Sequence, residues 1–216
     1  MFLDPLYSPG SDFIGMNNGF ITDIISKSLA GQNISVEVKQ HERTFRSIFA
    51  GFLPIYEDQY PTMANSKVMS SKFIWDIMMY WGGIGPLFFK QKLTDLKFME
   101  LVRPILSEFF ILNVRLQNLF RDWATIDDAQ KHAGGNFLDY AEIPLLQQLN
   151  RNLLEFQEDE ALLQQLRKNI KSAEELAAEI YLEALKYYPE LKDENVDLSK
   201  SQAQHLKEFY DEFTIC

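Results

Sequence analysis

Apolar residues recur at helical spacing along most of this chain, and the first such run follows a proline-rich turn. From Gly10 to Leu29 the apolar positions fall mostly at helical spacing, as on one face of an amphipathic helix. Ser11 or Asp12 could cap the start of this helix, and Gly31 suits its end. The apolar positions are Phe13, Ile14, Phe20, Ile21, Ile24, Ile25 and Leu29.

The next segment, residues 33–38, alternates apolar and polar positions instead. Ile34, Val36 and Val38 would lie on one face of a β-strand. The same pattern also suits an extended linker that leads into the following helix. We favour the linker.

Two aromatic-rich helices are predicted after this segment. In residues 41–60, five apolar side chains trace one helical face, and Pro54 is expected to kink that helix. In residues 66–81, the apolar positions spread around the whole circumference, so we expect burial on most sides. The sequence GGIGP at 82–86 is expected to end the second helix. The five face residues of the first are Phe45, Ile48, Phe49, Phe52 and Tyr56.

Helical patterns also cover the second half of the chain. One runs from about Leu93 to Trp123, with an interruption at Pro104. The polar residues 124–137, which include Gly134 and Gly135, are predicted to form a loop or hinge. Three amphipathic helices rich in Glu and Lys are then predicted at 145–156, 161–188 and 202–213. The fold class is therefore mainly α, divided into sections 1–31, 32–125 and 126–216.

Composition narrows the class of protein. A hydrophobic content of 46% and 17 Phe indicate a folded chain rather than a disordered one. The net charge of -10 argues against nucleic-acid binding. Residues 1–108 hold 10 basic and 11 acidic residues, whereas residues 109–216 hold 11 and 20, so the second half is the acidic section. The single cysteine, Cys216, and the lack of an apolar run of membrane-spanning length favour a cytoplasmic protein without a membrane span.

Most common chemical motifs are absent from the sequence. It contains neither a G-x-G-x-x-G motif nor a phosphate-binding P-loop. His41, His132 and His205 lie far apart without metal-ligand spacing, so we predict no metal site. Cys216, at the end of the chain, is poorly placed to be an activated nucleophile. We assign no catalytic residue.

Trp75, Tyr80 and Trp81 lie in the second aromatic helix beside Gly82. Aromatic residues at such positions are most often part of the core, but their density also suits the lining of a substrate pocket. A related hypothesis places an apolar ligand among Phe49, Trp75 and Trp81.

The turn that precedes the first helix, DPLYSPGSDF at residues 4–13, suggests a binding role. Pro5 and Pro9 fix the backbone φ angle at two points, and Gly10 allows another molecule to approach the backbone closely. The N–H groups of Gly10, Ser11 and Asp12 would lie at the positive end of the helix dipole. An anion or the carbonyl edge of an isoalloxazine ring would suit that position. The alternative is an ordinary capped helix.

The sequence FLDPLYSPGSDF at residues 2–13 resembles a segment of flavin-dependent tryptophan-halogenase-like proteins and related FAD monooxygenases. In those proteins a D-P-x-x-S-x-G turn opens a helix under the flavin. The resemblance continues through residues 56–89 and covers about residues 2–125, which leaves the last ninety or so unmatched. It implies a helical C-terminal region of an FAD-dependent oxidoreductase, with Trp75, Tyr80 and Trp81 on the substrate side. The implied FAD contacts are Asp4, Pro5, Ser8, Gly10 and Ser11.

Departures from the family pattern change the expected chemistry. Tryptophan halogenases carry a glutamate where this chain has Tyr7, and they bind halide through two backbone amides where this chain has Pro9 and Gly10. Because Pro9 lacks an N–H group, we expect an oxidoreductase reaction other than halogenation by the known arrangement. The substrate would be a small aromatic or apolar molecule.

The Rossmann element, the Gly-Asp pair and the catalytic lysine of that family are also absent from the sequence. We therefore expect Met1 to mark a truncated coding region, a split gene or an internal start. Activity would then require an N-terminal FAD-binding chain or domain and a flavin reductase, and the chain alone would bind FAD weakly or not at all. The alternative hypothesis is a non-catalytic helical interaction module, in which the acidic helices after Gly135 pack on a partner.

Overall fold

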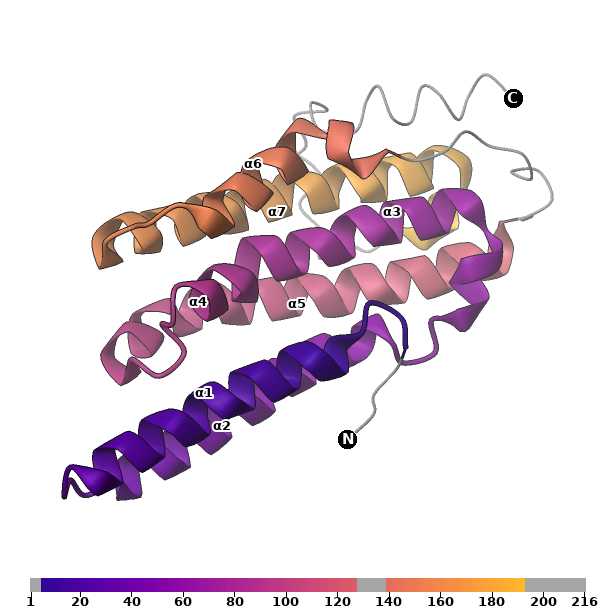
Figure 1. Ribbon diagram of the computed structural model, residues 1–216. Helices are drawn as coiled ribbons and strands as arrows, with labels where there is room; N and C mark the ends of the chain where they lie inside the picture. Colours follow the sequence, from indigo (N-terminus) through magenta and orange to yellow (C-terminus); the bar gives the residue numbers. More distant parts are fainter. Residues whose placement is uncertain (1–4, 128–138, 193–216) are drawn as a thin grey trace.

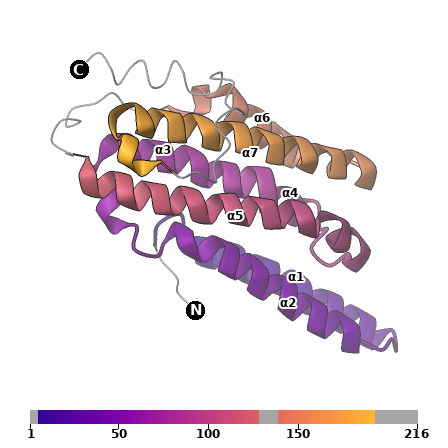
Figure 2. The same cartoon turned by 180° about the vertical axis from the view of Figure 1, so that it is seen from behind.

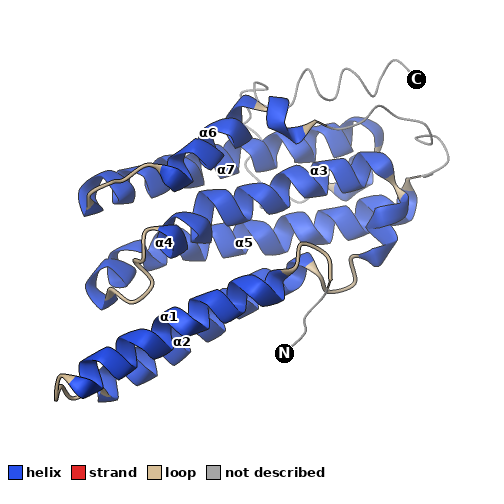
Figure 3. Cartoon of the chain, in the orientation of Figure 1, coloured by secondary structure: helices blue, strands red, loops and turns tan. Residues whose placement is uncertain are grey.

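The computed structural model describes residues 5–127 and 139–192, and within these ranges the secondary structure is helical without a β-strand (Figure 3). This confirms the prediction of a mainly α protein. The predicted helix at 202–213 and most of the predicted loop at 124–137 lie outside the described residues.

The first layer is a helical hairpin of α1 (Pro9–Leu29) and α2 (Ser35–Phe52), which lie side by side (Figure 1). Inside the hairpin, Nε2 of the buried His41 lies 2.8 Å from the Asp23 carboxylate. The His41 ring also stacks on Phe20, with 4.8 Å between ring centroids. These contacts hold the two helices together.

The ends of α1 agree only in part with the sequence prediction. The helix begins at Pro9 rather than after a Ser11 or Asp12 cap, because proline at the first helical position has a suitable φ and lacks only an N–H that the helix does not use. Ser8 stands at the cap position but makes no side-chain capping bond. At the other end Gly31 has a φ of 73°, as expected for a glycine that ends a helix.

The predictions for residues 33–38 and for Pro54 are corrected by the structure. The helix α2 already begins at Ser35, because the Asn33 side chain accepts a hydrogen bond from the Ser35 amide at 3.0 Å and turns the chain into it. The linker prediction was therefore wrong. Pro54 does not kink a long helix; α2 ends at Phe52 and continues as the short 3₁₀ helix η1 (Leu53–Ile55).

The second layer contains a nearly continuous helical rod. After the short η2 (Tyr60–Ala64) come α3 (Ser66–Ile77), the π-helix η3 (Met78–Ile84) and α4 (Gly85–Phe89). The predicted end at GGIGP was wrong, because the wide π turns carry the helix through these glycines. At Gly85 the approach is too close for a side chain, since a Cβ there would lie 2.8 Å from the carbonyl oxygen of Tyr80.

The long helix α5 (Leu96–Ile126) lies beside this rod. The side chain of Asp95 caps it by accepting from the Phe98 amide at 3.1 Å. Pro104 lies inside the helix without ending it, so the predicted interruption there does not occur. The third layer, with η5 (Tyr140–Glu142), α6 (Pro144–Leu154), α7 (Asp159–Tyr187) and η6 (Pro189–Leu191), contains the two amphipathic helices predicted for this region.

Figures 1 and 2 show the same stacking from opposite sides: the α1–α2 hairpin, then α3, α4 and α5, then α6 and α7. One hydrophobic core extends through all three layers, from Met16 in α1 to Ala184 in α7. As predicted, α3 is buried on most sides, including Val68, Ile74 and Trp75. Among residues 5–127 and 139–192, no helix has the length and apolar character needed to cross a membrane.

Candidate functional site

A cavity of about 160 Å³ lies between the α1–α2 hairpin and the α3–η3 rod. Its wall is mainly apolar and aromatic, and it includes Phe13 from α1, Phe52 from α2 and Trp81 from η3. The lining includes two carboxyl groups, those of Asp12 and Asp76, and no Lys, Arg or His among the described residues belongs to it. The cavity therefore combines an apolar interior with two acidic side chains.

The N-terminal turn forms one edge of this cavity through Tyr7 and Pro9. Tyr7 and Ser8 both have left-handed backbone conformations, with φ angles of 60° and 52°. Such conformations cost non-glycine residues about 1–3 kcal/mol each and persist only where surrounding contacts impose them. Backbone hydrogen bonds from Ser8 to Pro5 and from Ser11 to Ser8, both 3.2 Å, close the turn.

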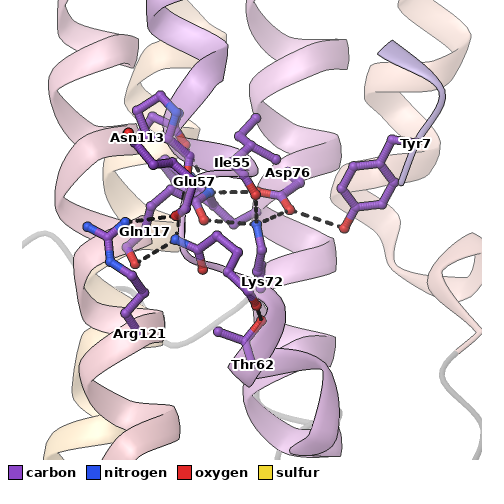
Figure 4. Close-up of polar contacts among 12 residues, drawn as sticks. Tyr7, Ile55, Glu57, Thr62, Lys72, Asp76, Asn113, Gln117 and Arg121 are labelled. Atoms are coloured by element: carbon purple, nitrogen blue, oxygen red, sulfur yellow. Dashed lines mark hydrogen bonds and ion pairs between the residues drawn. The ribbon is translucent and has the colours of Figure 1, made fainter. Parts of the chain in front are cut away.

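The side chain of Tyr7 anchors the turn to the interior. Its hydroxyl donates to Oδ2 of Asp76 at 3.1 Å (Figure 4). Its ring packs on Phe73 with 5.8 Å between centroids. Burial raises the pKa of Tyr7, and the neighbouring Asp76 carboxylate raises it further. Tyr7 therefore stays protonated and donates its hydrogen to Asp76.

Asp76 belongs to a buried polar network between α3 and α5 (Figure 4). The ammonium of Lys72, one turn earlier, donates to Asp76 Oδ2 at 2.7 Å, to Gln117 Oε1 at 2.9 Å and to the Ile55 carbonyl at 3.0 Å. Gln117 Nε2 in turn donates to Asp76 Oδ1 at 2.7 Å. Both carboxylate oxygens of Asp76 and all three ammonium hydrogens of Lys72 are thus paired.

Burial acts on both members of this ion pair. It lowers the pKa of Lys72 and raises that of Asp76, while the attraction between the two charges opposes both shifts. Because three acceptors surround the Lys72 nitrogen, we treat the pair as ionised. The network fixes the position of Asp76 and, through it, of Tyr7.

A second carboxylate–tyrosine pair lies in the same wall. Asp12 comes from α1 and Tyr80 from η3, and the two side chains lie near enough for each to affect the pKa of the other. Burial is the largest cause that raises the pKa of Tyr80, and the Asp12 charge adds to it. Burial also raises the pKa of Asp12, although the nearby Tyr80 hydroxyl lowers it. No Lys, Arg or His among the described residues pairs with Asp12 within 4.0 Å.

The structure separates the three aromatic residues that the sequence suggested for a substrate pocket. Tyr80 and Trp81 line the cavity. Trp75 is fully buried outside the lining, where its Nε1 donates to Asn113 Oδ1 at 3.0 Å. Phe49 also lies outside the lining and packs on Phe13 with 5.4 Å between centroids.

The residues predicted to contact FAD lie mostly on the outside of the turn. Pro5, Ser8 and Ser11 are exposed, and Gly10 is half-buried. The Ser11 amide, which was a candidate cofactor contact, donates to the Ser8 carbonyl within the turn. Asp4 lies outside the described residues.

Sequence reasoning missed Lys72, Asp76 and Gln117. A signal was present, because a Lys and an Asp four residues apart in a helix expected to be buried must pair with each other. Gln117 could not be found this way, since it comes from another helix 41 residues after Asp76.

No cluster of three His, Cys, Asp or Glu side chains within the described ranges has the geometry to hold a metal ion. Comparison with known proteins adds no assignment: no family model matches the chain, and no curated protein or solved structure is significantly similar to it.

Removing the Tyr7 hydroxyl tests its anchoring role. Tyr7→Phe is expected to lower the free energy of unfolding by about 1.5 kcal/mol, the lower end for a hydrogen bond to a charged group. Urea unfolding would measure this loss, and hydrogen exchange should show faster exchange of the Ser8 and Ser11 amides. Tyr140→Phe, at an exposed site, is the matched control. Unchanged exchange at these amides in Tyr7→Phe would refute the anchoring role.

Proposed function

We propose that this chain supplies the flavin-facing turn and the substrate cavity of an FAD-dependent oxidoreductase, and that a separate FAD-binding portion completes the site. The observation that carries this proposal is the shared cavity wall. Tyr7 and Pro9 of the turn line the same cavity as Tyr80 and Trp81, which come from the helix with the family-like sequence. A flavin ring over the turn would then lie next to the substrate.

The division of the turn into two sides supports this arrangement. Pro5, Ser8 and Ser11 face solvent, whereas Tyr7 and Pro9 line the cavity. A cofactor would approach from the exposed side and a substrate would occupy the cavity. The bound flavin would supply the redox chemistry, and this chain would position the reactants and exclude water.

The outer face of α1 supports the presence of a completing portion. Every exposed residue of this 21-residue helix is uncharged, whereas a solvent-facing helix surface normally carries charges. Interface cores are depleted in charged residues. Because α1 starts at the proposed flavin-facing turn, we place the FAD-binding portion against this helix. The exposed large apolar residues are Ile14, Ile21, Ile25 and Leu29.

Affinity purification of the tagged chain from its native cells, followed by flavin analysis, tests the proposal. We expect a complex with a protein that contains a G-x-G-x-x-G motif, with one FAD per complex by absorbance, while the isolated chain binds no FAD tightly. Gly10→Ala should weaken FAD binding by the complex about tenfold or more, because a methyl group would obstruct close approach to the turn. Asn150→Ala is the control, because Asn150 is exposed on α6 in the third layer, away from both the turn and α1.

The outcomes separate the proposal from its alternatives. Tight FAD binding by the isolated chain would contradict the need for a second portion. A stable complex without flavin, unaffected by Gly10→Ala, would favour the non-catalytic interaction module. The uncharged face of α1 is the observation that favours this second candidate.

A further inference from the structure

We infer that the cavity between α1 and η3 binds a single-ring aromatic ammonium ion, with its charged group at Asp12 and its ring among the aromatic side chains. As an assignment of substrate class, this rests on the proposed function. The binding itself can be measured on this chain alone.

The size of the cavity limits the ligand to one ring. Its volume is about 160 Å³. An apolar protein cavity of about 150 Å³ accommodates benzene, so a phenyl ring fills most of this space. A fused two-ring system would extend beyond this space.

The charge of the cavity selects a cation. The Asp76 carboxylate is neutralised by Lys72 at 2.7 Å, whereas Asp12 has no such cation within salt-bridge distance among the described residues. Burial raises the pKa of Asp12, and its place in the first turn of α1 acts in the opposite direction, because the helix dipole favours the ionised form. An ammonium ion would therefore meet a charged acceptor, and an anion would meet repulsion.

A hydrogen bond already made in the wall also favours a ligand that donates hydrogen bonds. Tyr7 gives its hydroxyl hydrogen to Asp76. The Tyr7 oxygen then has only acceptor capacity left for a ligand. An ammonium group carries three N–H donors and no acceptor, which matches this wall.

Aromatic side chains in the lining complete the recognition. Phe13, Phe52 and Trp81 come from three different elements that surround the cavity. Aromatic faces within about 6 Å of a cation attract it, and aromatic side chains recognise ammonium ligands in this way. The same rings provide the apolar contact that a phenyl group requires.

Calorimetric titration with three one-ring probes of similar size tests this inference: benzylamine, benzyl alcohol and benzoate. We expect benzylamine to bind about tenfold or more tightly than benzyl alcohol, which corresponds to about 1.4 kcal/mol, and benzoate not to bind. Fluorescence gives a second readout, because Trp81 lines the cavity while Trp75 and Trp123 are fully buried outside it.

A charge-neutralising variant identifies the group responsible. In Asp12→Asn the preference for benzylamine over benzyl alcohol should disappear while benzyl alcohol still binds, which shows that the cavity remains folded. Glu100→Gln, an exposed acidic residue of α5, should leave the preference unchanged. Equal binding of benzoate and benzylamine, a preference that persists in Asp12→Asn, or failure of all three probes to bind would overturn the inference.

Failure of this inference and failure of the proposed function remain distinguishable. If the complex binds FAD but the isolated chain does not bind benzylamine, the proposed function is supported and the proposed ligand class is wrong. If the chain binds benzylamine but forms no complex with a flavoprotein, the ligand site is supported and the proposed oxidoreductase function is wrong.

Discussion

Replacing Lys72 by methionine is expected to lower the free energy of unfolding by about 3–5 kcal/mol. The reason is the charge left behind: Asp76 is only 5% exposed and would lose its cationic partner, while Gln117 and the Ile55 carbonyl would lose a donor. Chemical denaturation followed by circular dichroism measures this change. Few single substitutions in a protein of this size have effects as large.

Two further variants test this interpretation. Lys97→Met removes a lysine from an exposed position of α5 and should change the stability by no more than about 0.5 kcal/mol. Lys72→Met combined with Asp76→Leu should recover much of the lost stability, because two apolar side chains can replace a buried ion pair. A loss of less than about 1 kcal/mol for Lys72→Met alone would contradict an ionised buried pair.

The second large effect concerns the apolar contact between α5 and the π-helix. Phe109 is fully buried, and its ring lies so near Gly82 and Gly83 that Cβ atoms there would be 3.6 and 3.7 Å from it. Phe109→Ala should therefore lower the free energy of unfolding by about 3–5 kcal/mol, through lost apolar burial and the resulting void.

An exposed apolar residue on the same helix provides the comparison. Ile111 is 53% exposed, so Ile111→Ala should change the stability much less than Phe109→Ala when both are measured by denaturant unfolding. Similar losses for the two variants would mean that Phe109 does not pack as described.

Much of the helical architecture could be predicted from the spacing of apolar residues. The pattern in residues 161–188 predicted α7, and the even spread of apolar residues in 66–81 predicted the burial of α3. Both are strong signals, because they extend over several turns. Short patterns were less reliable. The alternation at 33–38 led to the prediction of a linker, whereas Val36 and Val38 are exposed residues of a helix.

The errors at Pro54, Gly82 and Pro104 have related causes. Proline and glycine disfavour helices in isolated peptides, but tertiary packing can override this preference. That packing cannot be predicted from the neighbouring residues in the sequence. The helix ends before Pro54, passes through Gly82 as a π-helix and continues through Pro104.

The candidate site could be predicted only in pieces. Tyr80 and Trp81 were indicated by aromatic density, whereas Tyr7 was noted only as a departure from the family pattern and not as a site residue. Their convergence on one cavity depends on how α1 folds back against η3, which no local pattern reveals. The flavin assignment remains a prediction that the purification experiment tests.

The π-helix determines which way two aromatic residues of the cavity wall face. A π turn corresponds to an α-helix with one extra residue, and it shifts the facing of the residues around it by about 100°. Tyr80 and Trp81 lie within that stretch. Deletion of one residue from that stretch is expected to restore regular α-helical turns and to change the directions in which the two rings face. The aromatic wall of the cavity therefore depends on the irregular geometry of this one helical segment.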